Sequence, residues 1–222
     1  MLTSRHDGFA LPALHKSAEG TAKGGVVVIQ EIFGVTPHIE EIAARFAAAG
    51  YEVIAPAYFA RIDPAFQAPV NAEGIAQGRD AVARTPWAQV IGDTQAAIDA
   101  LAKPAFVTGF CWGGAAAWAA AAQCANVRAA SCFYGRAIIN LLDQPPRAPA
   151  MLHYGARDAS IPPADIERVR AAAPATTPIH IYDAGHGFCR RESHDYSAEA
   201  SEIALTRTLD WFARWRASGD GA

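Results

Sequence analysis

The sequence lacks the features that mark several common classes of protein. Its longest apolar stretches are interrupted well before the ~20 residues that a membrane-spanning helix needs. Lys and Arg number 19 against 22 Asp and Glu, so the net charge of −3 gives no basic excess for binding nucleic acid. The N-terminal residues hold no apolar core of the kind found in signal peptides. We therefore expect a cytoplasmic protein that binds neither membranes nor nucleic acid.

Cysteine is also scarce, and its spacing argues against the commonest paired uses of the residue. The chain has four cysteines with no C-x-x-C pair among them. In a reducing cytoplasm we expect free thiols, with neither a disulfide nor a metal site. The four residues are Cys111, Cys124, Cys132 and Cys189.

The length and composition suit a single folded unit. The 222 residues, of which 51% are hydrophobic, are enough for one large α/β domain with a well-buried core. No internal repeat or low-complexity segment marks a second domain. We expect one domain over residues 1–222, acting as a monomer.

Apolar runs typical of buried strands alternate with helical patterns along the chain. Residues 25–30 form a continuous apolar run, typical of a strand buried on both faces of a parallel sheet. Thr36 and Pro37 then begin a helix that ends near Gly50. The alternation predicts a mostly parallel central sheet with helices on both faces. Further strands are expected at 51–55, 105–108, 127–134, 148–154 and 178–182, and further helices at 87–101, 115–123, 161–173 and 198–216.

Two segments fit this alternation less well. Residues 56–85 contain three prolines, and we interpret them as an irregular excursion that covers a site. Residues 8–15 are consistent with a short strand at the edge of the sheet.

The segment around Cys111 has the strand–turn–helix pattern of a nucleophile elbow. Gly109 and Gly113 lie two residues before and after it, giving G-x-C-x-G. In so tight a turn, a side chain at either glycine would collide with neighbouring backbone. Cys111 would then lie at the N-terminus of the next helix, where the helix dipole favours a thiolate or an oxyanion. The alternative is a structural cysteine buried beside a tight turn.

Polar residues follow four of the expected strands, and ligands of open α/β sheets bind at these carboxyl ends. The residues are Glu31, Cys111, Asp158 and His186. Their order of nucleophile, acid and histidine is that of α/β-hydrolases. His186 would accept the thiol proton, and Asp158 would hold the histidine tautomer and stabilise its cationic form.

Each of these residues also has a simpler interpretation. Asp158 could belong to a turn or cap the following helix, His186 could be an ordinary loop histidine, and Glu31 could be an exposed carboxylate. The combination is more specific than any one member, because independent strand ends supply the right residue types in the right order. The weaker histidine candidates are His153, His180 and His194.

Four segments together resemble the dienelactone hydrolase family, over nearly the whole chain from about Gly25. The resemblance implies an α/β-hydrolase fold and no cofactor. It also implies hydrolysis of the enol-lactone 4-carboxymethylenebut-2-en-4-olide to maleylacetate in chloroaromatic degradation, with a small anionic lactone or ester as the bound partner. The segments are Gln30-Glu31-Ile32-Phe33-Gly34, Gly109-Phe110-Cys111-Trp112-Gly113-Gly114, Gly155-x-x-Asp158 and Ala184-Gly185-His186-x-Phe188.

The same resemblance implies roles for individual residues. It makes Cys111, Asp158 and His186 the catalytic triad. It makes Glu31 an auxiliary carboxylate: binding of an anionic substrate moves Glu31, which then takes the proton of the thiol. It assigns the oxyanion-binding N–H groups to Ile32 and to Trp112, which stands where the family often has Leu. Among the arginines, Arg190 matches the one that binds the substrate carboxylate, and Arg79 and Arg61 are both candidates for a second.

Two other functions remain open at this point. The first is a general carboxylesterase or thioesterase of the same fold that acts on neutral esters. The second is a non-catalytic protein whose pocket binds a ligand or senses oxidants through Cys111.

Overall fold

The computed structural model describes residues 1–217, and one seven-stranded sheet organises them. The strand order is β3-β5-β4-β6-β7-β8-β9, and every neighbouring pair is parallel except β3 with β5. The mostly parallel sheet predicted above is confirmed, with its antiparallel strand at one edge. The strands are β3 (Ala13–Lys16), β4 (Gly25–Ile29), β5 (Glu52–Pro56), β6 (Ala105–Phe110), β7 (Val127–Phe133), β8 (Ala150–Gly155) and β9 (Ile179–Tyr182).

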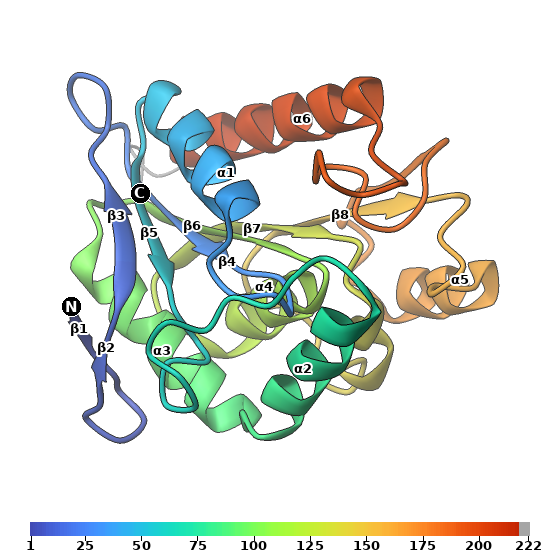
Figure 1. Ribbon diagram of the computed structural model, residues 1–222. Helices are drawn as coiled ribbons and strands as arrows, with labels where there is room; N and C mark the ends of the chain where they lie inside the picture. Colours follow the sequence, from blue (N-terminus) through green and yellow to red (C-terminus); the bar gives the residue numbers. More distant parts are fainter. Residues whose placement is uncertain (218–222) are drawn as a thin grey trace.

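Helices cover both faces of this sheet (Figure 1). On one face lie α1 (Pro37–Ala48) and α6 (Ala198–Ala217), and on the other lie α3 (Trp87–Ala100) and α4 (Trp112–Gln123). The shorter α5 (Pro163–Ala172) follows β8, and a 3-10 helix, η1 (Arg136–Asn140), follows β7. No helix within residues 1–217 is long and apolar enough to span a membrane.

The central strands are buried along their whole length, because helices pack on both of their faces. Every residue of β4, β6 and β8 is buried. The Ala-rich run of α4 is buried from Trp112 to Ala122, since small side chains let this helix lie close to the sheet. The candidate site residues follow directly or within a few residues after the ends of strands of this sheet.

The excursion between β5 and α3 is more regular than expected. Residues 72–83 form a helix, α2 (Ala72–Ala83), so the interpretation of this part as irregular was wrong. Asn71 caps it by accepting a hydrogen bond from the Gly74 N–H at 2.9 Å. Its glycines allow close packing, since a Cβ on Gly78 would lie only 2.4 Å from the Ile32 carbonyl oxygen. The helix therefore packs directly on the segment that follows β4.

The chain begins with a small two-stranded ladder outside the main sheet. Strand β1 (Leu2–Thr3) pairs antiparallel with β2 (Ala10–Leu11). The expected edge strand at 8–15 is therefore divided between β2 and β3.

Candidate active site

The four strand-end residues all follow the carboxyl ends of parallel strands of the main sheet. Glu31 follows β4, Cys111 follows β6, Asp158 follows β8 and His186 follows β9. Hydrogen bonds and charge interactions link these side chains into two connected groups, described in turn below. One contains Cys111, His186 and Asp158, and the other contains Glu31 and Arg190.

Cys111 occupies a strained turn between β6 and α4. Its φ of 56° and ψ of −118° are rare for a residue with a side chain. A Cβ on Gly109 would lie 2.0 Å from the Gly113 carbonyl oxygen, and one on Gly113 would lie 2.4 Å from that of Gln30. The steric reason given above for both glycines therefore holds. Cys111 is partly exposed, whereas the other three cysteines are buried free thiols.

Asp158 and His186 form a short hydrogen bond. Nδ1 of His186 lies 2.6 Å from Oδ2 of the buried Asp158 carboxylate. The other oxygen, Oδ1, accepts the Ser160 backbone N–H at 2.8 Å and its hydroxyl at 2.6 Å. Ser160 was not anticipated from the sequence, although Asp-x-Ser is a common turn pattern. Both oxygens of Asp158 are thus held, and one of them orients the imidazole.

The charge state of His186 depends on its two neighbours. Burial disfavours the imidazolium, but negative charge on Cys111 and the hydrogen bonds to Asp158 and Cys111 outweigh it and raise the pKa to about 10. Burial raises the pKa of Asp158, but the bonds from His186 and Ser160 prevail and lower it overall. Once Cys111 is deprotonated, its anion and the His186 cation therefore stabilise each other.

Glu31 and Arg190 make a buried ion pair in the same site. Nη1 of Arg190 lies 2.5 Å from Oε2 of Glu31, and Arg190 also lies over the Phe33 ring at 5.0 Å. Burial opposes the charge on Arg190, yet Glu31 keeps its pKa above the usual value. The simpler interpretation of Glu31 as an exposed carboxylate is therefore wrong, since its side chain is buried and paired with a cation.

The two N–H groups expected to bind an oxyanion lie on segments that meet at this edge. Ile32 follows β4, and Trp112 is the first residue of α4. The Trp112 ring is buried against Phe59, Tyr58 and Trp87, with centroid distances of 5.2, 5.7 and 6.3 Å. An aromatic wall contributed by the excursion after β5 and by α3 thus packs on Trp112, the residue after Cys111.

The two other candidate arginines lie in different settings. The Arg61 guanidinium donates to both oxygens of Asp7 and to both oxygens of the fully buried Asp93. These bonds favour a structural role for Arg61 in fastening the excursion to α3. Arg79 is exposed on α2.

The weaker histidine candidates lie apart from Cys111. His153 is fully buried and bonds Ser131 at 3.1 Å and the Tyr182 hydroxyl at 2.8 Å. His180 stacks on His153 at 5.6 Å, and the side chain of His194 is 92% exposed. These contacts give His153 and His180 a packing role beneath α6.

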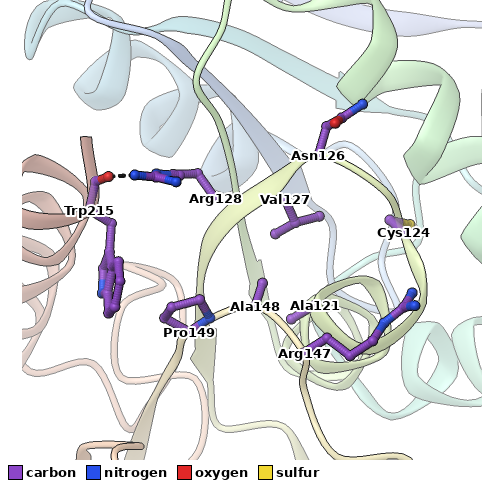
Figure 2. A pocket seen from close by; sticks show the side chains of 9 residues that line it. All are labelled: Ala121, Cys124, Asn126, Val127, Arg128, Arg147, Ala148, Pro149 and Trp215. Carbon is purple, nitrogen blue, oxygen red and sulfur yellow. Dashed lines mark hydrogen bonds between the residues drawn. The ribbon is translucent and has the colours of Figure 1, made fainter. Parts of the chain in front are cut away.

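A hollow of about 280 Å³ lies at the opposite edge of the sheet, where β7 and β8 begin (Figure 2). The Arg128 guanidinium on one side donates to the Trp215 carbonyl, while Arg147 lies on the far side. This hollow contains none of the strand-end residues. Its lining is Ala121, Cys124, Asn126, Val127, Arg128, Arg147, Ala148, Pro149 and Trp215.

Comparison with known proteins gives a consistent answer for this arrangement. The sequence profile of the dienelactone hydrolase family matches residues 11–215. The chain belongs to this family. Its members are hydrolases, which confirms the general class of chemistry. The similar solved structure confirms the α/β-hydrolase fold implied by the resemblance.

Individual family members are similar over most of their length. A protein named "Putative carboxymethylenebutenolidase" from Escherichia coli strain K12 is 35% identical, over 94% of this chain and 84% of its own. The "Carboxymethylenebutenolidase" of Pseudomonas sp. strain P51 is 29% identical, over 92% and 91%. A crystal structure described as a putative dienelactone hydrolase from Klebsiella pneumoniae is 32% identical with a TM-score of 0.82, covering 96% of this chain and 97% of that one.

Proposed function

We propose that this hydrolase opens 4-carboxymethylenebut-2-en-4-olide (dienelactone) to maleylacetate, with Cys111 as nucleophile. The observation that carries the proposal is the chain of contacts from Cys111 through His186 to Asp158, ending in the 2.6 Å bond between Nδ1 and Oδ2. It combines a nucleophile, a base and a group that orients the base. The E. coli and Pseudomonas proteins bear the name of this activity, which also supports the choice of substrate.

The reaction has two halves. The Cys111 sulfur attacks the lactone carbonyl, and the backbone N–H groups of Ile32 and Trp112 bind the oxyanion. The ring C–O bond then breaks, leaving a thioester on Cys111 and an enolate that takes up a proton. His186 next removes a proton from water, which attacks the thioester, and the acid product leaves as the thiol regains its proton.

The Glu31–Arg190 pair supports an anionic substrate. A guanidinium can bind a carboxylate through two parallel hydrogen bonds, so a substrate carboxylate can compete with Glu31 for Arg190. Glu31, once released, would take the proton of the Cys111 thiol. Activation of the nucleophile would then depend on substrate binding, which limits oxidation of the resting thiol.

A general esterase or thioesterase is the second candidate. Trp87 favours it, because this partly exposed ring, stacked on Trp112, adds apolar surface that suits a neutral acyl group. Both candidates use the same triad and differ in whether substrate charge contributes to binding.

Initial rates on dienelactone and on p-nitrophenyl acetate, measured with the purified protein, test the proposal. We expect a higher kcat/KM for dienelactone. A clear preference for p-nitrophenyl acetate would support the general esterase instead. Hydrolysis of neither substrate, by protein whose Cys111 still reacts with iodoacetamide, would favour the non-catalytic alternative.

A further inference from the structure

Gln30 has a buried side chain that joins two backbone segments at the active-site edge. It is 1% exposed and stands directly before Glu31 at the end of β4. Its Nε2 donates to the Glu31 carbonyl oxygen at 3.3 Å, and its Oε1 accepts the Tyr58 N–H at 3.2 Å. One amide therefore connects the segment after β4 to the segment after β5.

The Glu31 carbonyl shares a rigid peptide plane with the N–H of Ile32. In a trans peptide these two groups point in opposite directions, so holding the carbonyl fixes the direction of the N–H. The Gly34 N–H also donates to this carbonyl, at 3.4 Å. Within the described residues the Ile32 N–H makes no hydrogen bond, which leaves it available for a ligand.

Tyr58 is itself held firmly. Its hydroxyl lies 2.7 Å from Oγ1 of Thr94, and its carbonyl accepts a bond from Gln89 at 3.4 Å. Its fully buried ring packs edge-on against Trp112 at 5.7 Å. Tyr58 thus contacts Trp112 through its ring and is linked to the segment before Ile32 through Gln30. The backbone N–H groups of Ile32 and Trp112 are the two expected oxyanion donors.

We propose that Gln30 is a positioning residue for the oxyanion hole: it orients the Ile32 N–H through the Glu31 carbonyl and aligns it with Trp112 through Tyr58. The inference rests on the proposed function, because an oxyanion forms only if Cys111 attacks a carbonyl. A donor that is aligned in advance stabilises developing charge without reorganising during the reaction. Gln30 therefore acts on the transition state and leaves the nucleophile unchanged.

A merely structural role for the Gln30 amide gives a different experimental pattern. Loss of packing would disturb every property of the site, including the reactivity of Cys111. Alkylation of Cys111 by iodoacetamide forms no oxyanion, whereas ester hydrolysis does, and so does addition of the thiol to a trifluoromethyl ketone. Comparing these reactions separates the two roles.

Gln30→Met removes both hydrogen bonds at nearly constant volume. We expect kcat to fall roughly 10- to 100-fold, less than the ~10²–10³ seen when an oxyanion donor is removed entirely. Affinity for a trifluoromethyl ketone should fall in parallel, while KM and the alkylation rate stay within about threefold. Gln95→Met is the matched control, because Gln95 bridges the N–H and carbonyl of Ala125 away from the site.

A second variant tests the inference even if Gln30→Met folds poorly. In Gln30→Glu, one oxygen still accepts the Tyr58 N–H, and only the protonated acid can donate to the Glu31 carbonyl. We expect its kcat, relative to wild type, to rise as the pH is lowered. All rates are divided by the folded fraction measured by circular dichroism, so that only native molecules count.

Two results would overturn the inference. One is a kcat close to that of wild type in Gln30→Met, and the other is an equal fall of hydrolysis and alkylation in both variants. Failure of the proposed function looks different, since Cys111→Ala would then retain hydrolysis whatever Gln30 does.

Discussion

Arg190 and Glu31 are 159 positions apart in the sequence, yet their side chains form a buried ion pair with 2.5 Å between Nη1 and Oε2. One atom of each, Nε of Arg190 and Oε1 of Glu31, is buried without a hydrogen-bond partner within the described residues. The pair is therefore incompletely satisfied, and a second carboxylate would find an unused donor there. Substitution of Arg190 therefore tests whether the charge of the substrate contributes to its binding.

Arg190→Ala should raise KM for lactones that carry a carboxylate. A hydrogen bond to a charged group contributes about 1.5–3 kcal/mol, which is roughly 10- to 150-fold in affinity. Neutral esters should be much less affected, so the measured quantity is the ratio of kcat/KM for dienelactone to that for p-nitrophenyl acetate. Using this ratio cancels any loss of folded protein, which lowers both rates equally.

Arg191→Ala is the control for Arg190→Ala. Arg191 is exposed, pairs with the exposed Glu41 at 3.3 Å and carries the same charge. It should leave the ratio unchanged. An equal loss on both substrates in Arg190→Ala would make Arg190 structural and would strengthen the case for a general esterase.

Asp158→Asn should preserve the fold and lower kcat by about 10⁴, the cost of the corresponding change in a serine protease triad. It should also lower the pKa of His186, because it removes an anion that stabilises the imidazolium. NMR titration of His186 measures this downward shift of its pKa.

Asp183→Asn and Asp195→Asn serve as comparisons for Asp158→Asn. Asp183 is exposed and bonded to Arg157, and Asp195 lies beside Gly185. If kcat of Asp158→Asn falls by less than about tenfold, Asp158 is a turn residue only. Asp183 or Asp195 would then be the candidate acid.

Arg61→Met should destabilise the protein by about 3–5 kcal/mol, because it leaves the fully buried Asp93 without its partner. Urea unfolding measures the loss. The double variant Arg61→Met/Asp93→Leu should recover much of it, since no unpaired charge remains. In folded protein the substrate ratio used for Arg190 should not change; a selective loss on dienelactone would show that Arg61 binds substrate.

The strands and the residues that follow them could be predicted because local pattern determines both. Continuous apolar runs marked β4, β6 and β8, and topology then brought Glu31, Cys111, Asp158 and His186 to one edge. The glycines around Cys111 were interpretable for the same reason, since their constraint is local. None of these inferences needed a distance between remote residues.

Features that depend on tertiary contacts could not be predicted from the sequence. Helix α2 contains Gly74 and Gly78, which weaken helical propensity, and both lie tight against other backbone, at Pro69 and at Ile32. The ion-pair partners of Arg61 and Arg190 depend on how distant segments pack together. The charge of an arginine therefore does not tell whether it binds substrate or has a structural role. The bridge made by Gln30 depends on the orientation of one amide, which no residue pattern encodes.

Hydrolysis of dienelactone by Cys111→Ala is the most direct test of the account. We predict that kcat/KM falls to the uncatalysed background while circular dichroism shows an intact fold, because the partly exposed elbow residue contributes little packing. The triple variant Cys124→Ala/Cys132→Ala/Cys189→Ala removes only buried thiols and should remain active. Turnover by Cys111→Ala close to that of wild type would contradict the mechanism.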